Sequence, residues 1–409
     1  MTFLHRHLLT VLFLSCSHVS YSFVSKFNFN SRSIRKENKG LNSDKAHGDG
    51  NDNDANSDGL QSTRKSFLTQ TAIVTASIVG STSIIFSKEL PVSAAENNPL
   101  QSLQNKSTSA DDVLSALKSS NHFAQYVNGG TAIVTGGNSG IGFETVASLA
   151  KAGMNVILCT RRYEAGLEAK NTLPADLQDK VIVTKLDLSD MNSIEKSTKE
   201  IISSPLAKNG VDVIINNAGV IDKEGTPVLT SQGLELQFGI NHVGHHMFTR
   251  ILLPFIKNNG RVVTVASEAH RFATNTETVL AGKGGYSGSK LCNILFAEAL
   301  QDRLMSTGRN DIKSVSLHPG VIATPLFDKS GGLWKFVPLI ADRTVKQGAA
   351  TTVLCALADN ENINGGSYYK DCSVFQPSVD TSRITRDSLW DSTESIIANN
   401  GFKMPVKLI

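Results

Sequence analysis

The sequence has little that would indicate binding to nucleic acid or metal. Its 40 Lys and Arg against 37 Asp and Glu leave a formal net charge of +3, and the basic residues are scattered. A phosphate-binding surface needs clustered positive charge, so the sequence predicts no nucleic-acid partner. The five cysteines form no CxxC pair and no His/Cys metal spacing. We therefore predict no metal site, and free thiols for those cysteines beyond Cys16, which lies in the N-terminal targeting region.

Residues 1–62 lack the apolar periodicity of a packed domain. Arg6 precedes an apolar stretch over residues 8–16 that is too short to span a bilayer, and small and polar residues follow, as in a signal peptide. Residues 23–62 are rich in Asn, Ser, Lys and Gly, so they bury too little apolar surface to fold. The part over residues 23–39 has almost no acids, as in transit peptides, whereas the acidic GDGNDNDANSDG behind it departs from that composition.

A second targeting signal follows over residues 63–96. TRKSFL precedes the apolar run 71–86 and PVSAAE, which resembles a twin-arginine export signal with Lys65 in place of the second arginine. This order of segments resembles the multipartite presequences of plastids acquired by secondary endosymbiosis, where a Phe such as Phe23 follows the first cleavage point. We predict that residues 1–95 target a plastid, with stroma, thylakoid lumen and membrane left open. If residues 71–86 stay uncleaved, they would associate with a membrane; the alternative location is the secretory pathway or the endoplasmic reticulum membrane.

The remainder is predicted as a linker and lead-in helix over residues 96–128, a domain over 129–398 and a tail over 399–409. In the domain, nearly all-apolar runs of strand length alternate with helical periodicity over residues 141–152 and 233–256, and no repeat of solenoid period is visible. This pattern predicts a doubly wound α/β fold of the Rossmann type, a parallel sheet with helices on both faces. Ligands bind such sheets beyond the carboxyl ends of the strands. The predicted strands are residues 131–135, 155–159, 181–186, 211–215, 261–265 and 314–317.

The glycine-rich stretch TGGNSGIG, residues 135–142, directly follows the first predicted strand and opens a helix. Gly136 permits a tight turn, Gly140 lets the backbone approach a pyrophosphate, and Gly142 lets the helix pack close to the strand. Backbone N–H groups and the helix dipole then form an anion site. The alternative is a flexible turn, but the flanking strand and helix favour a dinucleotide site.

The residues after the second strand favour NADP(H) over NAD(H). An NAD site usually offers an acidic residue there, whereas this sequence reads LCTRR, with Arg161 and Arg162. A guanidinium suits a 2′-phosphate, and we predict Arg161 as the main contact. The alternative is that both arginines line a solvated rim. Asp187, after the third strand, is placed to accept from the adenine amino group; a helix N-cap near Asp187 or Ser189 is the alternative.

Three further motifs follow later strands: NNAG at residues 216–219, VASEAH with Ser267, and YSGSK with Tyr286 and Lys290. Tyr286 and Lys290 share a helix face because they are four residues apart. A nearby ammonium with an oxidised nicotinamide lowers the pKa of a phenol, which predicts Tyr286 as a general acid or base. Ser267 is predicted to donate a hydrogen bond to the substrate oxygen. Asn241, in FGINHVGH, is predicted to anchor a water that links Lys290 to solvent. Taken singly, a surface pair or a helix cap is the simpler reading of these residues.

Together these motifs resemble the short-chain dehydrogenase/reductase family over about residues 131–398. TGGNSGIG is similar to TGxxxGxG, NNAG is identical to its usual form, and YSGSK fits YxxxK. The stretches ELQFGINHVGHHMFT, YSGSKLCNILFAEAL, HPGVIAT and GGSYYKDCSVFQPS narrow the resemblance to the branch of retinol dehydrogenases, WW-domain oxidoreductases and light-dependent protochlorophyllide reductases. Three features depart from it: Ala266 stands where a first serine is frequent, no WW-like module precedes the domain, and the extra segment of protochlorophyllide reductases has no clear counterpart.

The resemblance implies roles for individual residues. Ser267, Tyr286 and Lys290 match the catalytic triad, and Asn241 matches the fourth member. The loop HPGVIAT, residues 318–324, would lie against the nicotinamide, with Val321 and Thr324 near its carboxamide. The residues expected to contact NADP(H) are Gly136, Asn138, Ser139, Gly140, Ile141, Gly142, Arg161, Asp187, Leu188, Asn217, Ala218, Gly219, Tyr286, Lys290, Pro319, Gly320, Val321 and Thr324.

The sequence indicates the substrate less specifically than it indicates the cofactor. PLFDKSGGLWKFVPLI, residues 325–340, is densely apolar between residues 326 and 339, which predicts either a cover over an apolar ligand or a packing surface. The sequence therefore predicts an NADP(H)-dependent oxidoreductase that transfers a hydride to or from a lipophilic alcohol, aldehyde or ketone. The alternatives are a light-dependent C=C reduction like that of protochlorophyllide reductase, and an NADP(H)-binding scaffold without turnover. The oligomeric state does not follow from the sequence.

Overall fold

The computed structural model describes residues 100–222, 228–322 and 341–405, all within one compact unit. The predicted targeting segments, the apolar run 71–86, the segment 326–339 and Thr324 lie outside the described residues. No helix among the described residues has the length and apolar character needed to cross a membrane.

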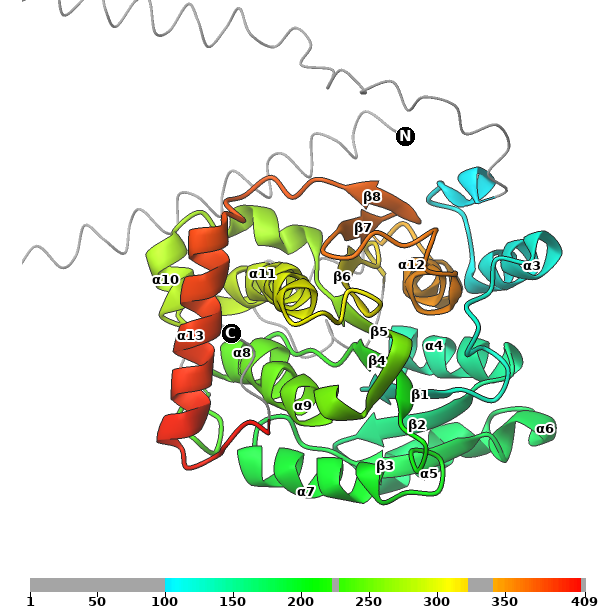
Figure 1. Ribbon diagram of the computed structural model, residues 1–409, viewed down its shortest axis with the longest axis horizontal. Coiled ribbons are helices and arrows are strands. Elements are labelled where there is room, and N and C mark those ends of the chain that lie inside the picture. The colour runs from blue at the N-terminus through cyan, green and yellow to red at the C-terminus, as the bar shows by residue number, and fades with distance from the viewer. Residues whose placement is uncertain (1–99, 223–227, 323–340, 406–409) are drawn as a thin grey trace, which may run out of the picture. The chain divides into compact units, whose positions relative to one another are not determined.

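One sheet organises the described residues (Figure 1), and its strand order is β3-β2-β1-β4-β5-β6-β7-β8. All neighbouring strands are parallel except the pair β7 and β8. The order reverses beside β1, which pairs with both β2 and β4, and such a switch point is where doubly wound sheets bind ligands. The predicted doubly wound fold is confirmed. The strands are β1 Thr131–Thr135, β2 Asn155–Thr160, β3 Val181–Lys185, β4 Val211–Asn216, β5 Ile256–Val265, β6 Lys313–His318, β7 Tyr368–Lys370 and β8 Ser373–Phe375.

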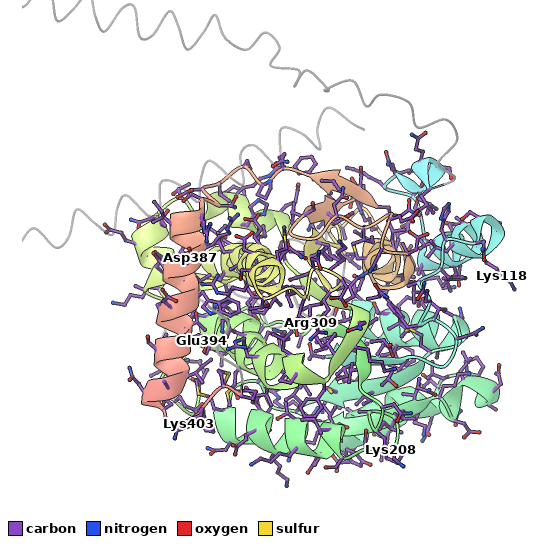
Figure 2. All side chains as sticks on the ribbon, viewed as in Figure 1. Lys118, Lys208, Arg309, Asp387, Glu394 and Lys403 are labelled. Atoms are coloured by element: carbon purple, nitrogen blue, oxygen red, sulfur yellow. The ribbon has the colours of Figure 1, made fainter. Side chains whose placement is uncertain are left out.

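Helices cover both faces of the sheet, because the central strands bury side chains on both. Along β1, Ala132 and Val134 belong to one buried cluster and Ile133 to the other. The first cluster holds α3 (Ala110–Ser120), α4 (Gly140–Lys151) and α12 (Val345–Leu357). The second holds α7 (Met191–Ile202), α9 (His245–Leu252), α11 (Gly285–Ser306) and α13 (Arg383–Asn399). Side chains fill the space between these layers, while the labelled Lys118 and Lys403 lie at the periphery (Figure 2).

The segment before β1 packs as part of the same unit. Ser109 and Asp112 form a reciprocal capping box that starts α3. Val113 and Leu117 of α3 are fully buried in the cluster that also contains α12. At the other end, residues after α13 contribute the partly buried Phe402 to the second cluster.

The predicted helix over residues 233–256 is broken into short pieces. α8 (Leu236–Phe238) leads into a π-helical turn over Gly239–Gly244, and α9 follows. A 3-10 turn over Leu253–Phe255 ends this region, and β5 begins at Ile256, five residues before the predicted strand. The remaining short helices are α5 Tyr163–Asn171, α6 Ala175–Gln178 and α10 Thr276–Leu280.

The four cysteines of the described residues are free and buried, as predicted. Burial raises the pKa of each thiol, so all four are protonated at neutral pH. No group of three or more His, Cys, Asp or Glu in the described ranges is arranged to hold a metal ion.

Candidate active site

The glycine loop has the backbone that the motif predicts. Gly136 and Gly140 have φ of +63° and +53°, a region that disfavours residues with a Cβ. A Cβ at Gly142 would lie 2.3 Å from the Gly136 carbonyl oxygen and 2.4 Å from Nδ2 of Asn217. Gly137, which the sequence left without a role, is also tightly enclosed, with Leu158 2.9 Å from its Cβ position. The start of α4 therefore packs directly onto the loop.

The NNAG turn is joined to the end of β1 by hydrogen bonds. Nδ2 of Asn217 donates to the Thr135 carbonyl at 2.8 Å, and the backbone N–H groups of Asn217 and Ala218 donate to Thr135 Oγ1 at 2.9 and 3.0 Å. Asn138 accepts from Thr160 Oγ1 at 2.9 Å, which joins the glycine loop to β2. The loop, β2 and the NNAG turn thus form one rim at the carboxyl ends of β1, β2 and β4. Its other predicted members are the exposed Ser139 and the partly buried Ile141 and Gly219.

A methyl group at position 142 is expected to weaken cofactor binding strongly. In Gly142→Ala, the new Cβ overlaps backbone atoms of the loop, so the loop must move away from α4. We expect a loss of about 1–3 kcal/mol in stability and a rise of at least about tenfold in the Kd for NADPH. Fluorescence titration with NADPH and chemical denaturation measure the two effects.

Gly308→Ala is the matched control, because its φ of +77° is strained but nothing lies within 4 Å of its Cβ position. It should lose stability and keep NADPH affinity. An unchanged Kd in Gly142→Ala would contradict the assignment of this loop.

At the rim beyond β2, Arg161 and Arg162 are exposed and no acidic side chain takes the position typical of NAD sites. Neither guanidinium forms an ion pair with another described residue. Asp187 accepts from the Ser189 N–H at 2.9 Å and from its hydroxyl at 2.6 Å through the same oxygen. The alternative of a helix N-cap near Asp187 or Ser189 is met by the next residue, Asp190, which caps α7. Leu188 beside them is buried.

Ser267, Tyr286 and Lys290 meet where β5 ends against α11. Ser267 is hydrogen-bonded to the Tyr286 side chain. Nζ of Lys290 donates to the Val265 carbonyl at 2.9 Å and lies 5.7 Å from the centroid of the Tyr286 ring. Ser267 also caps the short turn Glu268–Phe272, since Oγ accepts from the Ala269 N–H at 3.2 Å. Ser267 therefore caps this turn and also contacts Tyr286, so the structural and the catalytic interpretations of this residue are compatible.

The predicted lowering of the Tyr286 pKa depends on an oxidised nicotinamide and stays a prediction, while the protein groups alone act in the opposite direction. Burial raises the pKa of Tyr286 to about 12, and the hydrogen bond from Ser267 only partly opposes this. Burial likewise lowers the pKa of Lys290 to about 8. Both shifts have one cause, because an enclosed site disfavours the charged form of either group. Tyr286 thus keeps its proton at neutral pH.

Asn241 lies in the π-helical turn, and its side chain holds two other parts of the site. Oδ1 accepts from the Val220 N–H at 2.8 Å, and Nδ2 donates to the Val220 carbonyl and to Ser289 Oγ, both at 3.0 Å. Ser289 Oγ in turn donates to the Tyr286 carbonyl at 2.8 Å. Asn241 therefore joins the NNAG turn to the helix that carries Tyr286. Sequence reasoning missed Ser289, although its place inside YSGSK was the available signal.

His245 is a second residue that the sequence analysis did not identify. Its Nδ1 lies 3.1 Å from the Asn241 carbonyl, and its Nε2 lies 2.8 Å from Thr135 Oγ1. Because a carbonyl only accepts, Nδ1 carries the proton and Nε2 accepts from the threonine. The ring thus connects the turn of Asn241 with the end of β1. No residue spacing in the sequence predicts this contact, since it depends on the π-helical turn.

The loop after β6 closes the site. Pro319 is buried, and Gly320 has φ of +98°. The carbonyl of Val321 accepts from the Asp342 N–H at 3.1 Å, and Ile322 forms a parallel bridge with Arg343. The predicted nicotinamide loop therefore stands beside the Ser267 turn at the same end of the sheet.

The doubly wound sheet brings the glycine loop and Ser267 to its carboxyl edge, and α11 brings Tyr286 and Lys290 against Ser267. The family model described as short chain dehydrogenase matches residues 130–331, and the chain belongs to this family. Members transfer a hydride and use a nicotinamide cofactor, so the protein is an oxidoreductase of that kind.

The relatives confirm the predicted branch. The chain is 35% identical over 292 residues to short-chain dehydrogenase TIC 32 A, chloroplastic, of Brassica napus, covering 65% of this chain and 88% of that one. It is 35% identical over 277 residues to human (Homo sapiens) retinol dehydrogenase 11, covering 64% and 84%. The WW domain-containing oxidoreductase of Gallus gallus is 31% identical over 294 residues, covering 66% and 69%. A putative uncharacterized protein from Mycobacterium paratuberculosis has a similar structure, with a TM-score of 0.53, 29% identity and coverage of 69% and 96%.

Proposed function

We propose that the protein is an NADP(H)-dependent oxidoreductase that transfers a hydride to or from a lipophilic alcohol, aldehyde or ketone. The observation that carries the proposal is the contact between Ser267 and Tyr286 beside Lys290, at the carboxyl ends of the strands. Tyr286 and Lys290 share one face of α11, and Ser267 is brought to them from the end of β5. A hydroxyl, a phenol and an amine in this arrangement suit proton transfer to a carbonyl oxygen.

The nicotinamide supplies or accepts the hydride. In carbonyl reduction, Tyr286 donates its proton to the oxygen that gains charge as the hydride arrives at carbon. Ser267 donates a hydrogen bond to the same oxygen and holds it at the phenol. In alcohol oxidation the proton returns to Tyr286, and the raised pKa of this phenol favours reduction at neutral pH.

The choice of NADP(H) rests on the rim beyond β2. Two exposed guanidiniums stand there with no described ion-pair partner, and a 2′-phosphate offers the acceptors that they lack. The left-handed backbone at Gly136 and Gly140, with α4 starting behind it, fits the pyrophosphate. Asp187 keeps one carboxylate oxygen outside its contact with Ser189, which suits the adenine amino group.

Arg161→Ser is expected to raise the KM for NADPH about 10- to 100-fold, since one or two charge-assisted hydrogen bonds are lost. The KM for NADH should stay within about threefold, because NADH has no 2′-phosphate. Arg162→Ser is the matched control and should have a smaller effect. Equal losses with NADPH and NADH in Arg161→Ser would contradict the assignment.

A lipophilic substrate is favoured by the surroundings of the phenol and by the relatives. Tyr286 packs with the apolar Ile221 and Ala269, and several relatives are named retinol dehydrogenases. The test is NADPH oxidation with matched series of long-chain, ring and short polar carbonyls. A kcat/KM that rises with apolar size supports the proposal, whereas NADPH binding with no turnover on any carbonyl would favour the scaffold.

A plastid location is proposed from the order of the targeting segments in residues 1–95 and from relatives named chloroplastic. Mass spectrometry of the mature N-terminus from isolated plastids tests it. Processing near residue 95 supports the proposal, and recovery of the protein in microsomes with residues 71–86 retained opposes it.

A further inference from the structure

The hairpin of β7 and β8 has a strained tip. Its two turn residues, Asp371 and Cys372, have φ of +54° and +58°. Two-residue hairpin turns of this kind favour Asn, Asp and Gly, and a cysteine there is unfavourable. The backbone N–H of Cys372 donates to Thr351 Oγ1 of α12 at 3.2 Å, which fixes the tip against the helix. The tip carries two adjacent charged side chains, Lys370 and Asp371, and each has a partner of opposite charge.

Lys370 reaches the turn that carries Ser267. Its Nζ donates to Oε1 of Glu268 at 2.6 Å, and Glu268 is the next residue after Ser267. The backbone N–H of Glu268 donates to Nδ1 of the buried His318 at 3.2 Å. Lys370 therefore holds the serine turn through Glu268.

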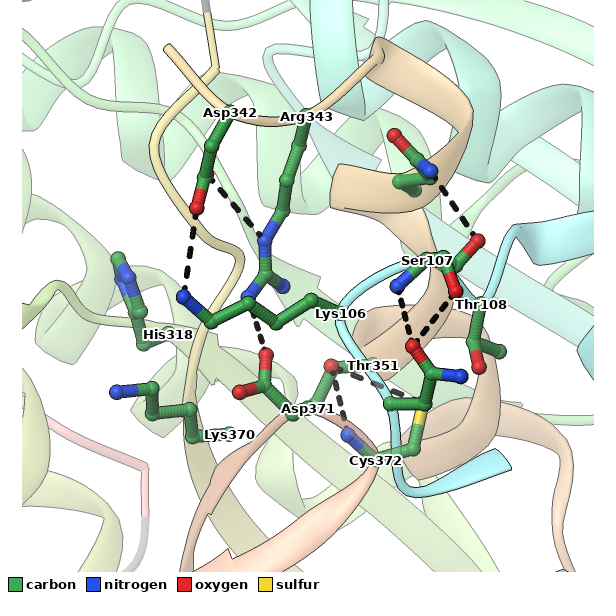
Figure 3. Close-up of polar contacts among 12 residues, drawn as sticks. Lys106, Ser107, Thr108, His318, Asp342, Arg343, Thr351, Lys370, Asp371 and Cys372 are labelled. Atoms are coloured by element: carbon green, nitrogen blue, oxygen red, sulfur yellow. Dashed lines mark hydrogen bonds and ion pairs between the residues drawn. The ribbon is translucent and has the colours of Figure 1, made fainter. Parts of the chain in front are cut away.

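Asp371 reaches the loop that carries Gly320, through Arg343 (Figure 3). The Arg343 guanidinium forms an ion pair with Asp371, and its side chain is only 4% exposed. The stem of Arg343 lies against Gly320, with Cδ 2.3 Å from the position of an added Cβ. Arg343 also forms the backbone bridge with Ile322. The ion pair between Arg343 and Asp371 thus fixes the loop that carries Gly320.

We propose that Lys370 and Asp371 are positioning residues, the first for Ser267 and the second for the nicotinamide loop. This inference rests on the proposed function of those two elements. One hairpin tip contacts both walls of the site, so the separation of Ser267 from the nicotinamide loop is set by two neighbouring residues. Each residue acts through a different wall, and the two should therefore affect different kinetic constants.

Lys370→Met and Asp371→Asn separate the two roles. Lys370→Met should lower kcat about 10- to 100-fold, the scale of a small misplacement of a reacting group, and leave the Kd for NADPH within about twofold. Asp371→Asn should raise the Kd for NADPH about tenfold and leave kcat at saturating NADPH within about threefold. NADPH titration by fluorescence and steady-state kinetics on the best carbonyl measure both.

For each of the two positioning roles, a second variant provides the test if the first variant does not fold. Glu268→Gln removes the partner of Lys370 and should reproduce its effect on kcat. Arg343→Met keeps the stem but loses the charge, and should reproduce the loss of NADPH affinity. Arg343→Lys keeps stem and charge, so it should bind NADPH within about threefold of wild type.

Two ion pairs remote from the site provide controls. Lys257→Met breaks a 2.8 Å pair with Asp212 at the opposite end of the sheet. Asp387→Asn, on α13, breaks a 3.0 Å pair with Arg303 of α11; Asp387 is labelled in Figure 2. Both should change melting temperature but neither Kd nor kcat.

The proposal is overturned if Lys370→Met and Asp371→Asn change Kd and kcat in the same proportion, or only as far as the controls do. Failure of the proposed function gives a different result. In that case the wild-type protein turns over no carbonyl, while NADPH titration still reports whether Asp371 and Arg343 position the loop.

Discussion

Replacing Tyr286 with phenylalanine is expected to lower kcat for carbonyl reduction about 10²- to 10⁴-fold, the range for loss of a positioned general acid. The phenol is buried, protonated at neutral pH and hydrogen-bonded with Ser267. Phenylalanine keeps the ring and its packing against Ile221 and Ala269. The loss should therefore fall on the proton transfer alone, and NADPH affinity should stay close to that of the wild type.

Steady-state kinetics and NADPH titration on the same preparations check this result. Tyr126→Phe is the matched control, because its hydroxyl is also buried and donates to the Ala356 carbonyl at 2.6 Å, away from the site. That variant should lose about 1 kcal/mol of stability and no activity. If Tyr286→Phe turned over carbonyls at the wild-type rate, another group would be the proton donor.

The sheet was largely predictable because its strands satisfy one simple condition. β1 and β4 are buried along their whole length, so nearly every residue in them is apolar or satisfied by a neighbour. Such runs stand out against polar loops. The glycine loop, NNAG and VASEAH were found for the same reason, since each follows a strand of this kind, whereas YSGSK lies on α11 and was found from the spacing of Tyr286 and Lys290. Of the predicted site residues, Thr324 lies outside the described residues, and the others stand at the carboxyl edge.

The hairpin of β7 and β8 was not predictable in this way. Its two strands are three residues each, and Val374 and Phe375 are exposed. Nothing in so short and mixed a stretch distinguishes a strand from a loop. The hairpin forms because β6 offers a free edge and because Arg343 and Thr351, far away in sequence, hold its tip. Contacts of this kind are set by tertiary structure.

The π-helical turn that carries Asn241 was also not predictable from the sequence. Apolar spacing over residues 233–256 is helical throughout, yet the chain turns into a π-helix at Gly239–Gly244. Gly244 packs there against the backbone of Leu188, whose carbonyl would lie 2.6 Å from an added Cβ. The turn faces Asn241 toward Val220 and Ser289. A π-turn at a functional site is common, but periodicity averages over it.

The protein is expected to lose stability steeply as the pH falls below about 6.5, because histidines are buried without charge. His242, His245 and His318 all have pKa values lowered by burial, that of His245 to about 4. In the unfolded chain these groups bind protons below their ordinary pKa of 6.5, whereas in the folded protein they stay neutral. The unfolded state then binds more protons, so the free energy of unfolding falls as pH falls.

Each such histidine contributes about 1.4 kcal/mol per pH unit between pH 6.5 and its folded pKa, so three contribute up to about 4 kcal/mol per unit. This is a large part of the roughly 5–15 kcal/mol that stabilises most domains, so a marked fall in the free energy of unfolding is expected between pH 6.5 and pH 5. Urea denaturation at a series of pH values measures the slope. His242→Gln removes one titrating ring and should reduce the slope by about 1.4 kcal/mol per unit, whatever it does to the stability at neutral pH. A free energy of unfolding that stayed constant from about pH 7 to pH 5 would show that these rings accept protons in the folded protein, and the neutral His245 that joins Asn241 to Thr135 would then be wrong.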